Sequence, residues 1–122
     1  MPRFVIQEHH ASHLHWDFRL EMDGVLKSWA IPKEPPNEKG VKRLAIQTED
    51  HDLNYIDFEG EIPEGYYGAG TVEIWDKGTY ELEERTRDKI VFRLKGKKLN
   101  GRFCLIRFKK GGEKAWLFFK VG

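Results

Sequence analysis

Histidines are concentrated in one short segment of this 122-residue chain. Four of the five lie between His9 and His15, and an aspartate and an arginine follow at alternate positions. Because residues two apart in a β-strand project from the same face, His15, Asp17 and Arg19 would share one face, with the apolar residues between them on the other. An imidazole and a carboxylate there could bind a divalent cation, and the guanidinium beside them could bind a phosphate or carboxylate.

A third ligand for such a cation would have to come from another segment. His9 or His10, at the end of the preceding predicted strand, is within reach, and the spacing leaves both open. A His/His/Asp set suits Mn, Fe(II) or Zn and leaves coordination positions for substrate and water. The alternative is a solvated, histidine-rich turn. A solvated face does not explain why the histidines lie opposite a strand face that is so apolar. We therefore predict a metal site.

A second polar group lies in the segment TEDHDLNY. It contains His51 and Tyr55, and Arg43 precedes it. A histidine that titrates near neutral pH can protonate a leaving oxygen or contact a transferring phosphoryl group. The alternative is a loop histidine without a role.

The elements that would position these residues are nearly all strands. Apolar and polar residues alternate in about eight or nine short segments, Asp23-Gly24 predicts a two-residue hairpin turn, and Lys77-Gly78 is expected to be another turn. No long segment has helical periodicity. We predict an all-β fold: a compact, mostly antiparallel β-barrel of about eight strands, with short turns and little helix.

Two segments do not fit simple strands. Residues 33–41 are proline-rich and predict a loop, whereas residues 59–70 contain four glycines and a proline. A phosphate-binding glycine loop would need a helix directly after it, and here a strand pattern follows. We therefore interpret residues 59–70 as tight turning at one end of the barrel.

Composition sets the remaining bounds. Hydrophobic residues make up 39% of the chain, so we expect one folded domain over residues 1–122. The single cysteine, Cys104, indicates a buried thiol and a reducing compartment. The longest apolar runs are only a few residues, too short to span a membrane, and no signal-peptide pattern is present. We therefore expect a cytoplasmic monomer without a membrane segment.

The net charge of +1 conceals a basic third of the chain. Residues 89–120 carry 11 lysines and arginines against one acid, Glu113. This excess favours binding of a polyanion, and we expect the segment to follow the backbone of a nucleic-acid substrate. The alternative is that these lysines protect strand edges from association.

Taken together, these motifs are specific. The segments VIQEHHASHLHWDFRLEMDGVLKSWAIPK and KRLAIQTEDHDLNYIDFEGEIPEGYYGAGTVEIWDKGTY resemble the 3′-phosphoesterase module of bacterial and archaeal DNA ligase D. The resemblance is dense over residues 4–80 and looser beyond them. It implies a β-barrel hydrolase with a Mn²⁺-dependent site (Zn²⁺ and Co²⁺ are also compatible). Such a nuclease acts in DNA repair by non-homologous end joining, removing 3′-phosphates and 3′-terminal ribonucleotides to leave a 3′-OH for ligation.

The resemblance also implies roles for individual residues. Matching the motifs QxH, LHxDFR, SWAxPK, KRLA and EDHxLxY places the family's metal ligands on His9, His15 and Asp17. Its catalytic and phosphate-contacting positions fall on Arg19, Lys33, Arg43, His51 and Tyr55. Gln7 and Glu49 match polar positions that line the site, whereas His10 and His13 are assigned to the turn.

The same resemblance implies partners. The expected substrate is a DNA or RNA-tipped 3′ end, such as that of a primer–template. No polymerase or ligase pattern accompanies the motifs, so we expect a stand-alone module that cooperates in trans with a DNA ligase, a polymerase or Ku. Only eight residues precede His9, fewer than in ligase D modules, so we expect ribonuclease activity to be affected more than phosphatase activity.

Two alternative functions are open at this stage. One is a non-haem Fe(II) oxygenase with His15, Asp17 and His51 as ligands and Arg43 for a keto-acid carboxylate. The other is a nucleic-acid-binding β-barrel without catalysis. Whether His9 or His51 joins the other two ligands distinguishes the oxygenase from the phosphoesterase.

Overall fold

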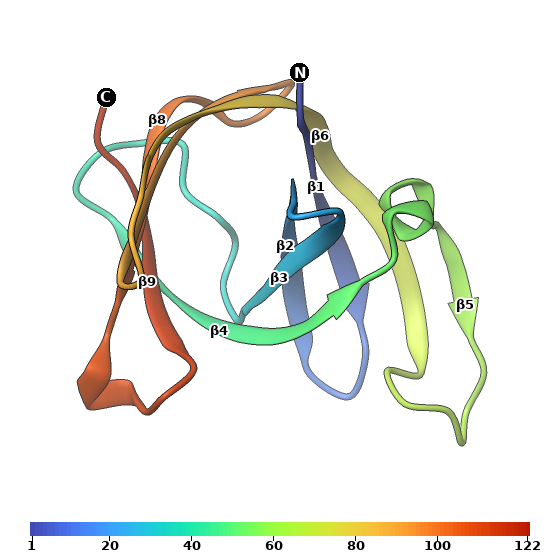
Figure 1. The fold of residues 1–122 in the computed structure, drawn as a ribbon. Helices are drawn as coiled ribbons and strands as arrows, with labels where there is room; N and C mark the ends of the chain where they lie inside the picture. Colours follow the sequence, from blue (N-terminus) through green and yellow to red (C-terminus); the bar gives the residue numbers. More distant parts are fainter.

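The computed structural model describes residues 1–122 and consists almost entirely of strands joined by short loops (Figure 1). Two short 3₁₀ helices, η1 (Leu53–Asp57) and η2 (Lys109–Gly111), are the only helical segments. Neither is long and apolar enough to cross a lipid bilayer. The strands are β1 (Arg3–His10), β2 (Leu14–Met22), β3 (Val25–Ile31), β4 (Lys42–His51), β5 (Gly60–Ile62), β6 (Gly70–Arg85), β7 (Lys89–Gly96), β8 (Asn100–Arg107) and β9 (Ala115–Lys120).

Eight of the nine strands close into a barrel. Neighbouring strands follow the order β1-β2-β3-β4-β9-β8-β7-β6, and β6 pairs back onto β1. β5 lies outside this ring and pairs with the first residues of β6. Because closure leaves the ring without an unpaired edge, it removes a route to strand-mediated association. The prediction of an all-β, mostly antiparallel barrel of about eight strands is confirmed.

The turn between β2 and β3 lies at Asp23-Gly24, as predicted. Both residues have positive φ, 58° and 78°, which is typical of the two-residue turns that match strand twist. Such a turn fixes the register of the hairpin, so Arg19 pairs with Ser28 and Asp17 with Ala30. The hairpin thereby positions part of the polar face of β2 relative to β3.

The core fills the interior of the barrel. Phe18, on the inner face of β2, has its ring centroid 5.0 Å from that of Phe118 and 5.7 Å from that of Phe92. All three are fully buried, and burial of each stabilises the fold by roughly 1.5–3 kcal/mol relative to exposure. Cys104 is free and buried, as expected.

The predicted turn at Lys77-Gly78 is wrong, because β6 continues through it. β6 pairs with β1 over residues 71–79 and with β7 over residues 78–85, so Gly78 lies between two strands. A Cβ at Gly78 would collide with the carbonyl oxygen of Lys95. The glycine therefore allows close approach of the β7 backbone rather than a reversal of the chain.

Both predicted loop segments join strands near the ends of the barrel. The proline-rich loop contains no strand and forms one isolated β-bridge, between Lys39 and Lys120. The glycine-rich segment forms β5 and then a turn over residues 63–69. A Cβ at Gly70 would collide with the backbone of His10, so this loop packs closely against the turn between β1 and β2.

Candidate metal centre

Strand register brings four of the predicted site residues together on the outer face of the barrel wall. His9 lies opposite His15, and Gln7 lies opposite Asp17, on the paired strands β1 and β2. Because residues two apart share a face, these four side chains form one patch. Trp16, between His15 and Asp17, belongs to the core cluster, and Glu8, between Gln7 and His9, pairs with His10. The site is therefore built on the outside of the barrel.

The ligand atoms form a compact triangle. His9 Nδ1 lies 3.2 Å from His15 Nε2 and 3.5 Å from Asp17 Oδ2, and His15 Nε2 lies 3.2 Å from the same oxygen. A divalent cation with bonds of about 2.0–2.2 Å places neighbouring ligand atoms roughly 3.0–3.5 Å apart. His9 and Asp17 are each 7% exposed, so two of the ligands are shielded from water. Donor type and spacing both fit a divalent cation.

Backbone carbonyls orient both imidazoles. His9 Nε2 lies 2.7 Å from the carbonyl oxygen of Gly68, and His15 Nδ1 lies 3.1 Å from that of His13. A carbonyl can only accept, so each of these nitrogens carries the proton and donates it. The other nitrogen of each ring then turns a lone pair toward Asp17. Metal-binding histidines are typically oriented in this way.

The electrostatics of the three groups favour added positive charge. The hydrogen bond that a protonated His15 donates to Asp17 raises the pKa of His15 above its usual value, against the opposing effect of burial. Burial alone would raise the pKa of Asp17, but the hydrogen bond with His15 and the charge of Arg19 outweigh it and lower that pKa. The carboxylate therefore stays ionised and attracts a proton or a cation to the triangle.

Arg19 lies beside the triangle and is held on several sides. Its Nε donates to Gln7 Oε1 at 2.7 Å, and its Nη1 donates to Ser28 Oγ at 2.8 Å and to His51 Nδ1 at 3.0 Å. Its Nη2 lies 3.6 Å from Asp17 Oδ2, outside hydrogen-bonding distance. Arg19 is 3% exposed, and its hydrogen bonds nearly fix the guanidinium, which leaves Nη2 as the nitrogen able to donate to a ligand.

Gln7 connects Arg19 to the helix η1. Its side chain is fully buried, and while Oε1 accepts from Arg19, Nε2 donates to the carbonyl oxygens of Tyr55 at 2.9 Å and Phe58 at 3.3 Å. A small apolar cluster of Val5, Leu26 and Ile56 anchors η1 to the outer face. Gln7 is thus a positioning residue, since its contacts orient the guanidinium and the Tyr55 segment together.

A bulge in β4 places His51 on the site. Leu26 pairs with His51 and Ser28 with Thr48, so three steps along β4 match two along β3. The extra residue returns His51 to the outer face, although strict alternation from Thr48 would turn it inward. His51 Nδ1 lies 3.0 Å from Arg19 Nη1, which can only donate, and 3.1 Å from the carbonyl oxygen of Glu49, which can only accept, so the two contacts belong to opposite tautomers of the ring. Burial and the charge of Arg19 lower the pKa of His51.

A cavity of about 380 Å³ lies over this site and is lined by the three candidate ligands together with Arg19, His51 and Tyr55. Tyr55 forms one wall, with its ring centroid 4.8 Å from that of His51 and 4.9 Å from the Arg19 guanidinium carbon. Burial raises the pKa of its phenol, so the hydroxyl stays protonated at neutral pH. Tyr67 and Gly68, from the β5–β6 loop, complete the rim. The cavity combines a candidate cation site with hydrogen-bond donors, a chemistry suited to a phosphate.

Three predicted residues lie apart from the cavity. Lys33 is exposed, and Arg43 Nε donates to the carbonyl oxygen of Glu34 at 2.9 Å; neither lines the cavity. Glu49 is exposed and approaches the site through its backbone, since its carbonyl oxygen lies 3.1 Å from His51 Nδ1. The structure therefore brings together Gln7, His9, His15, Asp17, Arg19, His51 and Tyr55, and leaves Lys33, Arg43 and the Glu49 side chain outside.

The other two histidines of the opening segment do not join the triangle. His10 is exposed and pairs with Glu8 at 2.6 Å, and His13 contributes its carbonyl oxygen. His51 does not belong to the His9, His15 and Asp17 group, and Arg19 lies between it and Asp17. The ligand set predicted for an oxygenase, His15, Asp17 and His51, is thus not assembled, whereas His9 is in place.

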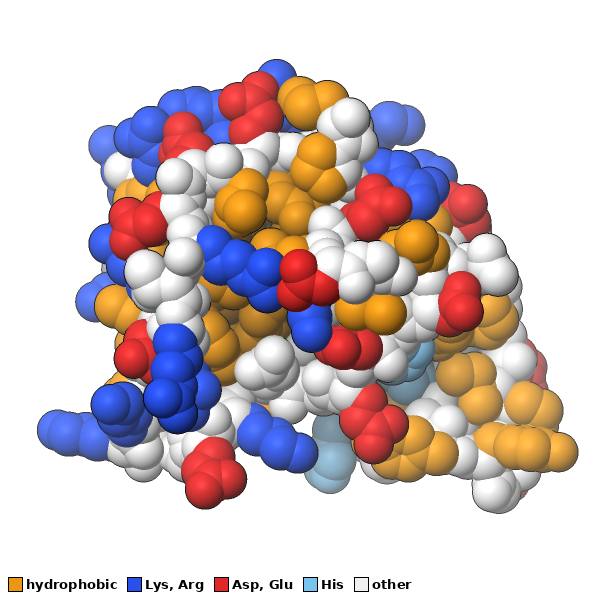
Figure 2. All heavy atoms as spheres, viewed as in Figure 1, with side chains coloured by type: hydrophobic (Ala, Val, Ile, Leu, Met, Phe, Trp, Pro, Cys, Tyr) orange, Lys and Arg blue, Asp and Glu red, His pale blue; other side chains and the backbone are white.

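The basic third of the chain lies on another side of the barrel. Residues 89–120 form β7, β8 and β9, which are separated from β1–β3 by β4 on one side and β6 on the other. In Figure 2, lysines and arginines gather toward the left and top, where Figure 1 shows β8 and β9, and histidines lie lower and nearer the centre. The expectation that these strands follow the backbone of a nucleic-acid substrate stays a prediction.

Sequence reasoning missed several contributors to the site. Ser28, which fixes Arg19, could have been found from the Asp23-Gly24 turn, because residues equidistant from a two-residue turn pair with each other. The Gly68 carbonyl and Tyr67 had no comparable signal, since their place depends on how the β5–β6 loop folds back on β1.

Comparison with known proteins agrees with this architecture. The sequence model of the family described as "DNA Ligase D 3′-phosphoesterase domain" matches residues 7–107. That range contains every residue of the candidate site. The chain belongs to the DNA ligase D 3′-phosphoesterase domain family.

Relatives of known name are long proteins of which this chain matches one part. It is 50% identical over 125 residues to the multifunctional non-homologous end joining protein LigD of Pseudomonas aeruginosa, covering 98% of this chain and 15% of the relative. It is 56% identical over 108 residues to the corresponding DNA repair protein of Mycobacterium tuberculosis, covering 85% of this chain and 14% of that protein. The chain thus spans about a seventh of the length of these relatives.

Proposed function

We propose that this protein is a divalent-metal-dependent phosphoesterase of DNA end joining that removes 3′-phosphates, and 3′-terminal ribonucleotides, to leave a 3′-OH. The observation that carries the proposal is the close triangle of His9 Nδ1, His15 Nε2 and Asp17 Oδ2, beside a buried arginine with one free nitrogen. Membership of the 3′-phosphoesterase domain family supports the same chemistry.

The metal of the proposal is Mn²⁺, with Zn²⁺ and Co²⁺ as compatible alternatives. His9, His15 and Asp17 would hold it through two nitrogens and one oxygen. When bound, such a cation supplies Lewis-acid polarisation of a phosphoryl oxygen.

Arg19 binds and orients the phosphate in this proposal. Three of its N–H groups are committed to Gln7, Ser28 and His51, so Nη2 alone is directed to the substrate. A fixed guanidinium stabilises the charge that develops on the phosphoryl oxygens without reorganising during the reaction. Hydrolysis breaks the bond between phosphorus and the 3′ oxygen and forms one between phosphorus and a water oxygen. The attacking water loses a proton, and the leaving 3′ oxygen gains one to become the hydroxyl.

His51 and Tyr55 donate hydrogen bonds to the phosphate group. The lowered pKa of His51 keeps its ring neutral near pH 7, and the tautomer that accepts from Arg19 through Nδ1 carries its proton on Nε2. The raised pKa of Tyr55 preserves its hydroxyl proton. A neutral imidazole is a good donor and a weak acid, which favours phosphate contact over protonation of the leaving oxygen for His51.

The rim of the cavity supplies a place for the adjoining nucleotide. Tyr67 is 98% exposed and Tyr66 is 69% exposed, in the loop that also holds Gly68 against His9. Exposed aromatic rings beside a phosphate site are suited to stacking on bases of a single-stranded end. The product would then be consumed by a ligation reaction, supplied by a DNA ligase that acts with a polymerase or Ku.

The proposal is tested with an end-labelled primer–template that carries either a 3′-phosphate or a 3′-terminal ribonucleotide. Wild-type protein with Mn²⁺ is expected to convert both substrates to 3′-OH ends, and a chelator should stop the reaction. Asp17→Ala should lower turnover by about 10²-fold or more, whereas Asp88→Ala, an aspartate in the β6–β7 turn, should not. Chelator-resistant turnover, or binding without turnover, would contradict the proposal.

A further inference from the structure

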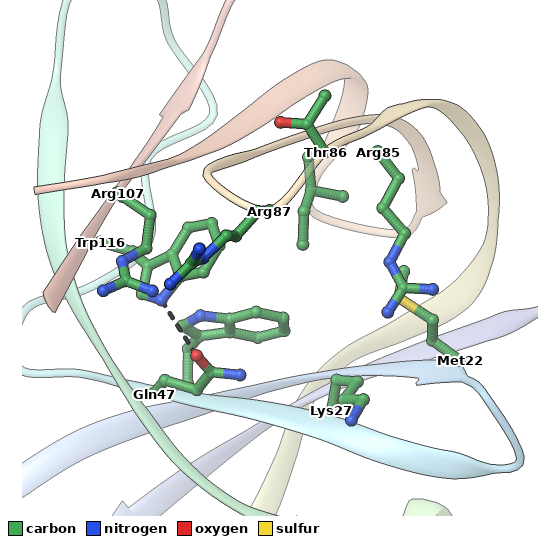
Figure 3. Close-up of a pocket in the computed structure, with 10 residues that line it drawn as sticks. Met22, Lys27, Gln47, Arg85, Thr86, Arg87, Arg107 and Trp116 are labelled. Atoms are coloured by element: carbon green, nitrogen blue, oxygen red, sulfur yellow. Dashed lines mark hydrogen bonds between the residues drawn. The ribbon is translucent and has the colours of Figure 1, made fainter. Parts of the chain in front are cut away.

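A second cavity opens at the end of the barrel where the β6–β7 turn lies, and the proposed reaction does not use it. Its volume is about 390 Å³, within the range of small-molecule sites. The lining residues come from β2, β3, β4, β6, the β6–β7 turn, β7, β8 and β9, and none of them lines the candidate metal centre. Figure 3 shows Thr86, Arg85 and Arg87 over the cavity, with Lys27 and Gln47 on its opposite side.

Hydrogen-bond donors dominate the lining. Trp29 is 1% exposed and its Nε1 has no partner, and Arg107 Nε is likewise buried without one. Gln47 uses its Oε1 to accept from Trp116 Nε1 at 3.1 Å, so its amide nitrogen is the end left to bind a ligand. A buried donor without a partner is destabilising, and a ligand that brings acceptors removes that penalty.

The cavity is also positively charged. Lys27 pairs with Asp50 at 3.0 Å and Arg85 with Asp23 at 2.7 Å, but Arg87 and Arg107 form no ion pair. No acidic residue lines the cavity. In Figure 3 the guanidinium groups of Arg87 and Arg107 both point to the side where Trp116 and Gln47 lie. Two arginines without counter-ions at one place favour a ligand with a concentrated negative charge, such as a phosphate.

Apolar and aromatic surface accompanies these charges. The indole of Trp116 packs edge-on against that of Trp29, with ring centroids 5.9 Å apart, and the guanidinium carbon of Arg107 lies 5.5 Å from the Trp116 ring centroid. Met22 and Ile90 complete the apolar lining. A bare phosphate would leave this surface unused, whereas a ligand with a planar ring and a phosphate would contact both parts.

We infer that this cavity binds a nucleoside monophosphate, either free or at the end of a strand, in a site separate from the metal centre. Arg87 and Arg107 would bind the phosphate, and the indoles would contact the base. Because the Gln47 amide nitrogen offers a donor, a base whose edges carry carbonyl acceptors is favoured over one that presents an amino group. Thymine, which has two carbonyl oxygens on its ring, fits better than adenine, which has an amino group.

Tryptophan fluorescence of the full chain with Mn²⁺ tests this inference, because two of the four tryptophans line the cavity. Thymidine 5′-monophosphate and a 5′-phosphorylated oligothymidylate are the two sources of the ligand, and saturable quenching by either supports the site. The first should bind more tightly than deoxyadenosine 5′-monophosphate. Equal affinity for inorganic phosphate would overturn the inference, since the aromatic lining would then contribute nothing.

Variants locate the binding. Arg87→Gln, in an exposed turn, should raise the Kd for thymidine monophosphate about tenfold or more, because a charge-assisted hydrogen bond is lost. Arg93→Gln removes the same charge outside the cavity and should change the Kd by less than about twofold. His51→Ala should leave it unchanged. An equal effect of the two arginine variants, or loss of binding in His51→Ala, would refute a separate site.

Discussion

Replacing Gln7 by leucine would test whether a buried amide positions the reactive groups. The change removes the acceptor of Arg19 Nε at 2.7 Å and the donor to the Tyr55 and Phe58 carbonyls at 2.9 and 3.3 Å. One charge-assisted hydrogen bond of about 1.5–3 kcal/mol and two neutral ones of about 0.5–1.5 kcal/mol each are lost. The leucine side chain offsets part of this by apolar burial, so we expect a net destabilisation of roughly 2–4 kcal/mol.

The catalytic effect should be separable from the loss of stability. A domain of this kind is stable by about 5–15 kcal/mol, so Gln7→Leu should stay folded at room temperature. Release of Arg19 and of the Tyr55 segment should lower 3′-phosphatase kcat by roughly 10- to 100-fold, because small displacements of positioned groups have large effects on rate. Mn²⁺ affinity should hardly change, since Gln7 does not contact the ligand atoms.

Three measurements decide the outcome: urea unfolding, turnover of a 3′-phosphorylated oligonucleotide, and Mn²⁺ titration. Gln7→Glu serves as the matched variant, because its carboxylate still accepts from Arg19 but cannot donate to the two carbonyls. It should retain more activity than Gln7→Leu while still loosening η1. Wild-type turnover in Gln7→Leu would refute the positioning role, as would loss of Mn²⁺ binding without a change in kcat.

Three further perturbations probe other parts of the account. Tyr67→Ala should raise KM for an oligonucleotide roughly tenfold with little change in kcat, and Tyr67→Phe should not; an unchanged KM in steady-state assays would exclude stacking. Gly78→Val should destabilise the barrel by at least about 3 kcal/mol in urea unfolding, because its side chain would meet the Lys95 carbonyl; a smaller loss would contradict that contact. In the metal-free protein, the ionised carboxylate of Asp17 stabilises the fold fully above its ordinary pKa of 3.8. This stabilisation is lost as pH falls through the lower pKa of the folded state, so the destabilisation caused by Asp17→Asn should shrink in acid.

Much of the site follows from period-two alternation and one turn. Alternation placed His15, Asp17 and Arg19 on one face, and the Asp23-Gly24 turn sets the pairing of Arg19 with Ser28. The choice between His9 and His10 depends on the register of β1 against β2. Spacing alone does not give that register, although the family resemblance selected His9.

What the sequence does not specify comes from irregular backbone and long-range packing. The bulge that turns His51 to the outer face adds one residue between Thr48 and His51 without a distinctive motif. Lys77-Gly78 has the composition of a turn, yet the glycine is there because two strands flank β6 closely. Local pattern cannot distinguish these two uses of glycine, since the difference lies in residues distant along the chain.

The metal centre is tested most directly by two variants, His9→Ala and His10→Ala. Each is assayed for Mn²⁺-dependent release of a 3′-phosphate and for Mn²⁺ binding by electron paramagnetic resonance. The two residues are neighbours in sequence, but only His9 directs a lone pair at His15 and Asp17, whereas His10 is exposed beside Glu8. We expect His9→Ala to lose both binding and turnover and His10→Ala to retain both. Activity that survives in His9→Ala, or disappears in His10→Ala, would contradict the site described for this protein.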